Sequence, residues 1–360
     1  MVAIQKLLEF VVTKDASDLH LLVGAHPSVR IDGALHPITD VSVLGPQEVE
    51  RMVFDLLTSE QKDLLLANKE IDFSFSWGEH ARFRVNVYYQ QGALAAALRL
   101  IPRRIRSIDE LGLPPVFHSF CNLRQGFIMV TGPTGHGKST SLAAMIQEIN
   151  SSRGEHILTI EDPIEYVYPP GKSLVSQREM HLDTHSWEIA LRSALREDPN
   201  VVLVGEMRDY ETISHAITIA ETGHLTFATL HTNNAAQTID RIIDVFPEHQ
   251  QVQVRLQLSN TLEAVVSQRL LPAVNGGRVV VAEVLIATPA VRTVIREGKT
   301  HLIDNIIQTS SEMGMISLEA ALAKLVSSGK LSQETAAQYA FRLEELERLL
   351  GRRPAATRRS

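Results

Sequence analysis

The chain has 360 residues, of which 44% are hydrophobic and 21% charged, an ordinary balance for a soluble globular protein of two domains. Its 42 acidic residues outnumber 35 basic ones, and the net charge of −7 argues against bulk nucleic-acid binding. With Cys121 as its one cysteine, it can form neither an intramolecular disulfide nor a four-cysteine zinc site. Because it has no run of about 18 apolar residues and no signal-peptide core, we expect a cytoplasmic protein without a transmembrane segment.

Residues 1–101 predict a small α+β domain with an antiparallel sheet. Helical spacing occurs at 1–12 and 47–68, and strand-like stretches occur between 15 and 33 and at 73–77, 81–88 and 93–101. Apolar and polar residues alternate along the second-to-last stretch, so its aromatic and aliphatic residues share one face and Arg82 and Arg84 share the other. Arg99 is the charged residue of the last stretch.

A proline-bounded polar stretch at 102–115 predicts a linker, after which the pattern changes. Apolar strands alternate with helical stretches, and we expect strands at 127–130, 157–160, 201–204, 225–229 and 279–285. This alternation is typical of a mostly parallel sheet covered on both faces. The chain then reads as helices up to residue 350. Residues 351–360 predict a disordered basic tail, for which a solubilising end is favoured over a partner-binding arm.

A phosphate-binding loop is the most specific motif in the chain. The pattern G-x-x-x-x-G-K-[ST] is filled by Gly132, Pro133, Thr134, Gly135, His136, Gly137, Lys138 and Ser139, between an apolar strand and a helical stretch. Its glycines let backbone N–H groups surround phosphate oxygens at a helix N-terminus. We expect residues from Gly132 to Thr140 to bind ATP, with Lys138 at the β- and γ-phosphates and the Ser139 hydroxyl on Mg²⁺.

Carboxylates follow the second strand expected in this part of the chain. Glu161 comes directly after it, and Asp162 and Glu165 come within the next four residues. Ligands of open α/β sheets bind beyond the carboxyl ends of the strands, so these acids would lie near a bound nucleotide. They would repel one another unless a cation such as Mg²⁺ or a water network uses them. Capping a helix or facing solvent remains open as the alternative.

The next two strand ends carry an acid and a histidine. Gly205 stands where a Walker B strand usually carries aspartate, so Glu206 is the first acid available to hold Mg²⁺ through water or to polarise the attacking water. Asp209 is expected to cap the next helix. His231 lies where a sensor of the γ-phosphate is expected, whereas His224, before the same strand, could be structural or functional.

The expected core lacks an obvious arginine to neutralise charge on the transferring phosphoryl group. Such an arginine is worth about 10³–10⁵-fold in rate and can come from a neighbouring subunit. Arg82, Arg84 and Arg99 are candidates. Facing solvent they would be ordinary surface charges, and facing a neighbour's nucleotide they would be catalytic, so both interpretations stay open here. The residues themselves predict a Mg²⁺-dependent ATPase core with a separate N-terminal domain.

Taken together, these residues resemble the secretion ATPases of type IV pili and type II secretion over nearly the whole chain. The ordered motifs are Ser17-Asp18-Leu19-His20-Leu21, the phosphate loop, an Asp box at Thr159–Glu165, a Walker B element at Gly205–Asp209 and a His box at Thr222–Thr232. Retraction motors of this family carry Ala-Ile-Arg-Asn-Leu-Ile-Arg-Glu, and residues 290–297 read Ala-Val-Arg-Thr-Val-Ile-Arg-Glu. Assembly and secretion motors carry a longer N-terminal region and usually a four-cysteine site, which are absent here.

The resemblance implies an α/β protein with a PAS-like domain at 1–101, the linker at 102–115, and a RecA-like ATPase domain with C-terminal helices at 116–350. It also implies a homohexameric ring in which Arg82, Arg84 and Arg99 approach the adjacent subunit's nucleotide. Glu206 is then the catalytic glutamate, supported by Glu161 and Glu165, and Ser139 and Glu206 hold Mg²⁺. His136 replaces the family's usual serine, and we expect little effect because this position contributes mainly its backbone N–H.

The function implied by the resemblance is ATP-driven retraction of a type IV pilus, which underlies twitching motility. Such a ring would turn a platform protein from the cytoplasmic side of the inner membrane at the pilus base, without contacting nucleic acid directly. Within the family, the alternatives are a pilus-assembly or type II secretion ATPase and a paralogue of the retraction motor. Outside it, they are a nucleotide-gated scaffold without turnover and a RecA-like DNA translocase, which the acidic balance disfavours.

Overall fold

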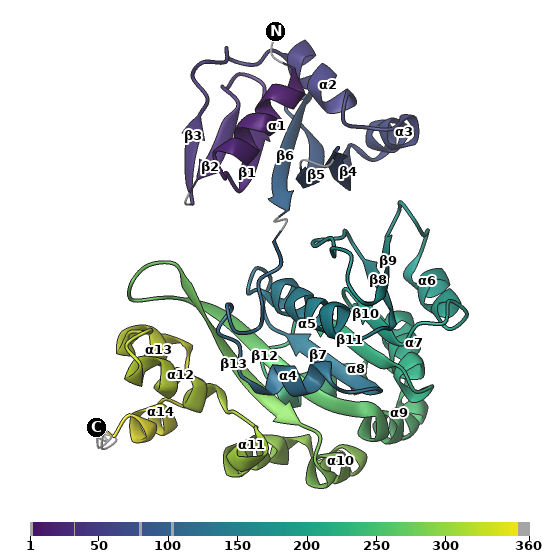
Figure 1. Cartoon of the computed structure of the whole chain (residues 1–360), viewed down its shortest axis with the longest axis vertical. Coiled ribbons are helices and arrows are strands. Elements are labelled where there is room, and N and C mark those ends of the chain that lie inside the picture. Colours follow the sequence, from purple (N-terminus) through teal and green to yellow (C-terminus); the bar gives the residue numbers. More distant parts are fainter. Residues whose placement is uncertain (1–2, 32, 79–80, 102–103, 352–360) are drawn as a thin grey trace. The chain divides into compact units, whose positions relative to one another are not determined.

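The computed structural model describes residues 3–31, 33–78, 81–101 and 104–351, and the chain divides into two compact units (Figure 1). The first unit comprises the chain up to Arg104 together with Pro163–Val167. The second comprises Ile105–Asp162 and the chain from Tyr168 onward. Pro102 and Arg103 of the expected linker, and 352–360 of the expected tail, lie outside the described residues. Among the described residues, no helix combines the length and apolarity that crossing a bilayer requires.

An antiparallel sheet forms the centre of the first unit, in the order β3-β2-β1-β6-β5-β4. Its strands are β1 (Asp18–Leu21), β2 (Ser28–Ile31), β3 (Ala34–Pro37), β4 (Glu70–Trp77), β5 (Ala81–Gln90) and β6 (Ala93–Ile101), and its helices are α1 (Ile4–Thr13), α2 (Pro46–Phe54) and α3 (Ser59–Asn68). The sequence predicts one helix over 47–68, but Thr58 starts a new one. Its hydroxyl accepts from the Gln61 N–H, and the Gln61 side chain accepts from the Thr58 N–H.

This sheet has one apolar and one polar face, as the alternation along β5 predicts. Phe83, Val85 and Val87 of β5 are fully buried in a cluster that includes residues of α1, α2 and α3. On the other face, Arg84 of β5 lies directly opposite Arg99 of β6, and Arg82 points the same way two residues earlier. Three arginines from two neighbouring strands therefore share the polar face of the first unit's sheet.

The second unit contains the mostly parallel sheet that the sequence predicts, in the order β13-β12-β7-β11-β10-β8-β9. Its strands are β7 (Gly126–Thr131), β8 (His156–Glu161), β9 (Leu174–Glu179), β10 (Val201–Val204), β11 (Leu225–Leu230), β12 (Leu262–Pro272) and β13 (Arg278–Ile286), and only β12 with β13 is antiparallel among the described pairs. The apolar runs predict five of these strands. They miss β9, which lacks an apolar run, and β12, which follows a helix without a turn signal.

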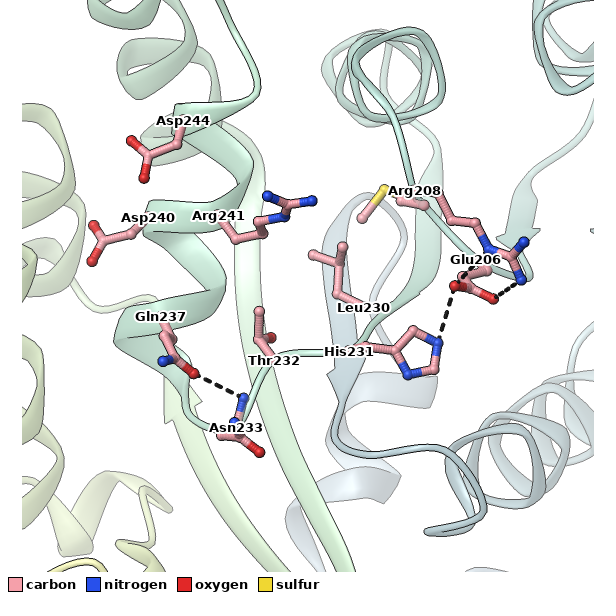
Figure 2. Close-up of a pocket in the computed structure, with 11 residues that line it drawn as sticks. Glu206, Arg208, Leu230, His231, Thr232, Asn233, Gln237, Asp240, Arg241 and Asp244 are labelled. Atoms are coloured by element: carbon pink, nitrogen blue, oxygen red, sulfur yellow. Dashed lines mark hydrogen bonds and ion pairs between the residues drawn. The ribbon is translucent and has the colours of Figure 1, made fainter.

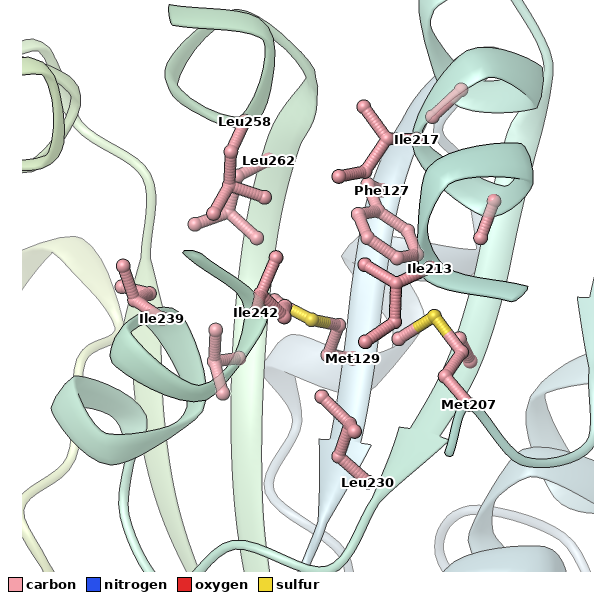
Figure 3. Packing of buried hydrophobic residues seen from close by; sticks show 14 of the residues in the cluster. Phe127, Met129, Met207, Ile213, Ile217, Leu230, Ile239, Ile242, Leu258 and Leu262 are labelled. Atoms are coloured by element: carbon pink, nitrogen blue, oxygen red, sulfur yellow. The ribbon is translucent and has the colours of Figure 1, made fainter. Parts of the chain in front are cut away.

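Helices cover both faces of this sheet. They are α4 (Val116–Cys121), α5 (Lys138–Ser152), α6 (Trp187–Ala194), α7 (Tyr210–Glu221), α8 (Ala235–Asp244), α9 (Glu248–Thr261), α10 (Pro289–Arg296), α11 (Ile303–Thr309), α12 (Leu318–Ser327), α13 (Gln333–Tyr339) and α14 (Leu343–Leu349). On one face, Phe127 and Met129 of β7 pack among apolar side chains of α7, α8 and α9 (Figure 3). Ile128 and Val130, which point the opposite way, are equally buried, and α5 packs on that side of β7. The last three helices pack on β12 and β13 in a smaller cluster.

Parallel pairing brings the carboxyl ends of four strands to one edge of the sheet. Thr131 of β7 is in register with Leu230 of β11. Two residues earlier on β11, Ala228 is in register with Val204 of β10, which is in turn in register with Ile160 of β8. The phosphate loop and the Walker B element begin directly after Thr131 and Val204, His231 of the His box follows Leu230, and Glu161 of the Asp box follows Ile160. The fold therefore positions residues of all four motifs at the same edge.

The chain leaves β10 at a position with little room for a side chain. A Cβ atom on Gly205 would lie 3.1 Å from the carbonyl oxygen of Ile160 and 3.2 Å from the Cα of Glu161. Both atoms belong to the backbone of the neighbouring strand β8, which cannot move aside without disturbing the sheet. The close approach of β8 thus explains why glycine stands where a Walker B strand usually carries aspartate.

We predict that Gly205→Asp, which restores the usual Walker B acid, lowers the free energy of unfolding by about 1–3 kcal/mol because the new side chain crowds β8. Urea denaturation followed by circular dichroism measures this change. Gly154→Asp is the matched control, because a Cβ on exposed Gly154 meets only the Lys172 carbonyl oxygen at 3.8 Å. Its effect should stay within about 0.5 kcal/mol. Equal losses in the two variants would refute the crowding argument.

Candidate active site

The phosphate loop connects β7 to the N-terminus of α5. Its φ angles are +79° at Gly135 and +82° at Gly137, left-handed values that glycine adopts without strain. Gly137 is also the N-terminal cap of α5, which begins at Lys138. The loop is therefore shaped to turn its backbone N–H groups toward an anion at the start of a helix.

The buried side chain of Lys138 places its ammonium group inside this loop. Nζ donates to the carbonyl oxygen of Gly132 at 2.9 Å and to that of Pro133 at 3.2 Å. It also lies 3.4 Å from Nδ1 of His231, which follows β11. The structure thus brings together the lysine of the loop and the histidine that the sequence singles out as a phosphate sensor.

His231 connects Lys138 to Glu206. Its Nε2 lies 3.0 Å from Oε1 of Glu206, and its Nδ1 lies 3.4 Å from both Lys138 Nζ and the Thr134 hydroxyl. Figure 2 shows the imidazole pointing at the carboxylate. A carboxylate only accepts hydrogen bonds and an ammonium group only donates them. The neutral imidazole with its proton on Nε2 therefore satisfies both neighbours at once.

Glu206 is held as a carboxylate by a second partner, Arg208. The guanidinium contacts both carboxylate oxygens at 2.8 Å (Figure 2). Burial opposes the charge of Glu206, but the hydrogen bond and charge of Arg208, followed by the charge of Lys138, keep its pKa below the ordinary value. Sequence reasoning missed Arg208. The pattern that could have predicted this contact is the spacing of Arg208 two residues after Glu206, because side chains two residues apart in an extended chain point the same way.

The two Asp-box glutamates lie in different environments. Glu161 is buried at the end of β8, where Oε1 accepts from the Thr159 hydroxyl at 2.7 Å and from the Gln177 amide at 3.4 Å. Glu165 lies in the segment Pro163–Val167, which is part of the first unit. The structure thus places Glu161 at the same sheet edge as Glu206, and the supporting roles of both glutamates stay predictions.

Two further polar residues that the sequence singles out, Asp209 and His224, form hydrogen bonds at the ends of α7. Asp209 caps α7, as predicted, by accepting from the Thr212 N–H at 2.9 Å. Nδ1 of His224 lies 3.0 Å from the Thr222 hydroxyl and 3.0 Å from the Ile219 carbonyl oxygen. Because His224 precedes β11, it lies at the edge of the sheet opposite the phosphate loop, and its contacts tie the end of α7 to the start of that strand.

Each of the three candidate arginines in the first unit contacts neighbours on its own sheet. The partners are the hydroxyls of Ser74 and Ser76 for Arg82, the carboxylate of Asp72 at 3.9 Å for Arg84, and the carboxylate of Asp18 at 2.9 Å for Arg99. The Arg99 side chain is nevertheless 70% exposed. These contacts orient the arginines on the polar face of the sheet, and a role toward a neighbouring subunit's nucleotide stays a prediction.

A cleft of about 660 Å³ opens beside Glu206 and His231 (Figure 2). Its other lining residues are Met207, Arg208, Leu230, Thr232, Asn233 and, on α8, Gln237, Asp240, Arg241 and Asp244. None of the phosphate-loop residues, all of which the structure describes, is among them. His231 therefore lies between the loop, where it contacts Lys138, and a cleft whose lining includes both acidic and basic side chains.

Ser139 and Glu206 offer oxygen donors that suit Mg²⁺. This ion prefers oxygen ligands and usually takes one or two protein groups together with waters and substrate phosphates. Within the part of the chain that the structure describes, no three His, Cys, Asp or Glu side chains converge into a metal site. A hydroxyl at the start of α5 and a carboxylate after β10 thus fit a metal that obtains its remaining ligands from a nucleotide.

Comparison with known proteins places the chain in a family. The family model for Type II/IV secretion system protein matches residues 1–347. The chain is 47% identical to the type IV pilus retraction ATPase PilT of Pseudomonas aeruginosa, over 94% of this chain and 98% of that protein. It is also 47% identical to a twitching motility protein of Neisseria gonorrhoeae, over 89% of this chain and 86% of that protein.

The same relationship appears among solved structures. A crystal structure of the pilus retraction motor PilT with bound ADP matches with a TM-score of 0.90 at 46% identity, covering 97% of this chain and 100% of that chain. The likeness therefore extends through both units. This chain belongs to the Type II/IV secretion system protein family, and pilus retraction ATPases are among its relatives.

Proposed function

We propose that this chain is an ATPase motor that powers the retraction of type IV pili. The observation that carries the proposal is the line of contacts from Lys138 through His231 to Glu206 at the carboxyl edge of the parallel sheet. It joins a phosphate-binding cation to an ionised carboxylate, two groups that ATP hydrolysis requires around the γ-phosphate. Kinship with retraction ATPases over nearly the full length of both chains supports the pilus part of the proposal.

In the proposed reaction, the loop N–H groups and Lys138 hold the β- and γ-phosphates of ATP. Glu206, ionised because Arg208 pairs with it, polarises the water that attacks the γ-phosphate. His231 donates its Nε2–H to Glu206 and faces Lys138 with Nδ1, so it orients the carboxylate relative to the phosphates. Bound Mg²⁺, held through Ser139 and Glu206, would neutralise phosphate charge.

For the whole chain, we propose a PAS-like domain at 1–101, a linker at 102–115, a RecA-like ATPase domain at 116–350 and a basic tail at 351–360. The antiparallel sheet of the first unit and the parallel sheet with its phosphate loop support the two domain types. Six copies form a closed ring, in which one copy supplies its arginines to the nucleotide of the next. This arrangement would provide the cation that the second unit does not obviously supply to the leaving phosphoryl group.

The proposed partner is a platform protein of the inner membrane, which the ring contacts from the cytoplasmic side at the pilus base.

The retraction-type motif at residues 290–297 lies on α10 and the residue that follows it. Arg292 is held inward by backbone carbonyls and by Glu263 at 2.7 Å, whereas Arg296 and Glu297 are exposed. Retention of this exposed pair supports the retraction branch over an assembly or secretion motor.

Phosphate release from ATP should occur with the wild-type protein and should fall about 10²-fold or more in Glu206→Gln, because the polarising carboxylate is gone. Lys138→Ala should also lose turnover, because the cation at the phosphates is removed. Glu211→Gln, on the exposed first turn of α7, is the matched control and should keep wild-type turnover. Nucleotide binding without any wild-type turnover would instead indicate a scaffold.

Arg82→Ala should lower turnover while nucleotide affinity stays nearly unchanged, because the arginine acts on the transferring phosphoryl group of a neighbouring copy. Mixing this variant with Lys138→Ala protein should restore part of the activity, since mixed rings contain sites with both groups intact. Steady-state ATPase assays across mixing ratios measure the recovery. Arg51→Ala, an exposed arginine on α2, is the control for general loss of charge. Absence of recovery in mixed rings would contradict a shared site.

A hyperpiliated, non-motile strain that lacks its own retraction motor should regain twitching and lose excess surface pili when it expresses this chain. Twitching-zone diameter and sheared-pilus yield measure the two effects, and the Lys138→Ala chain serves as the inactive control. Bald, non-motile cells that regain pili would instead support an assembly motor. Rescue by the inactive control would separate the phenotype from ATP hydrolysis.

A further inference from the structure

β12 continues along the phosphate loop after its partner strand has ended. It pairs in parallel with β7 as far as Ser267 opposite Thr131, where the two buried hydroxyls lie 2.9 Å apart. Beyond that pair it runs on to Pro272, with β13 on its other side. The edge that would otherwise face β7 now faces the loop, so its backbone N–H groups need partners other than a strand.

Two side chains join this edge to the loop. The N–H of Leu270 donates to Nδ1 of His136 at 3.1 Å. Gln268, which is 2% exposed, donates to the His136 carbonyl oxygen at 2.8 Å and accepts from the Ser141 hydroxyl of α5 at 2.7 Å. The loop is therefore tied to β12 through both the side chain and the backbone of residue 136, and the first turn of α5 is tied to β12 through Ser141.

The glycines of the loop show how closely β12 lies against it. A Cβ atom on Gly132 would overlap the carbonyl oxygen of Gln268, and one on Gly137 would lie 2.9 Å from the Gln268 amide nitrogen. Neither approach leaves space for a side chain. The path of the loop backbone is thus set by contact with β12 as well as by the loop's own conformation.

The contact with Leu270 requires a neutral imidazole, because Nδ1 accepts a hydrogen bond only without a proton. Burial of His136, followed by the positive charges of Arg269 on β12, Lys138 on α5 and Arg278 on β13, lowers its pKa from the ordinary value of 6.5. A lowered histidine pKa means that the bond is intact above pH 6.5 and is lost as the pH falls through the lowered value.

We propose that His136 is a positioning residue for nucleotide binding, which holds the phosphate loop in its binding shape by accepting a hydrogen bond from the free edge of β12. The inference rests on the proposed ATPase function, and it departs from the expectation that residue 136 contributes mainly its backbone N–H and that histidine there has little effect. A serine at this position would carry its oxygen one bond closer to the main chain than Nδ1. The hydrogen bond from the Leu270 N–H therefore depends on having histidine at position 136.

The test compares His136→Ala, which removes the acceptor, with His136→Asn, whose side-chain oxygen can occupy the place of Nδ1. We expect His136→Ala to raise both the KM for ATP and the calorimetric Kd for ADP about tenfold, with kcat within about twofold of wild type, and His136→Asn to stay close to wild type. As the pH falls from 7.5 through the lowered pKa of His136, the KM should rise more for wild type than for His136→Asn, which cannot gain a proton.

Equal values for His136→Ala and wild type, or equal losses in both variants, would overturn the inference. If His136→Ala does not fold, the pH comparison between wild type and His136→Asn decides alone, and parallel profiles refute the proposal. A wild-type protein that binds ADP but does not hydrolyse ATP would remove the proposed function, while the Kd comparison would still test His136.

Discussion

Parallel pairing of β7, β11 and β10 is the constraint on which the site depends. Because these strands run side by side in register, the groups that follow them leave the sheet at one edge. Lys138, His231 and Glu206 come from three different strand–loop junctions and touch only because of that pairing. A change in register of one strand would separate the cation from the carboxylate and leave each motif intact but unused.

The electrostatics of Glu206 show how one carboxylate is kept charged in a half-buried place. Burial alone would favour its protonated form, and the arginine two residues further on outweighs that cost. Histidine is suited to the position between Glu206 and Lys138, because its two ring nitrogens can donate to one and accept from the other. Nearby cations have a different effect on His136. There, burial and the positive charges of Arg269, Lys138 and Arg278 all favour the neutral imidazole.

Close backbone contact limits the site from two sides. On one side, β8 lies so near Gly205 that the Walker B acid is displaced to the next residue. On the other side, β12 lies so near the phosphate loop that Gly132 has no room for a side chain. These two contacts fix the backbone path at Gly132 and at Gly205. A fixed backbone path holds binding groups close to the geometry that phosphate recognition needs.

Features that depend on neighbouring residues in the chain were determined by the sequence itself: the phosphate loop, the alternation along β5, the cap at Asp209 and five strands of the parallel sheet. Their physical causes are local periodicity and local hydrogen bonding, which a reader of the sequence can follow. The tertiary structure alone decided that Lys138 meets His231, that Leu270 meets His136, and that β12 supports the loop. These partners are separated by 93 and 134 residues along the chain. No local pattern encodes such contacts, because they arise from the order in which strands pair and from the packing that excludes every other arrangement.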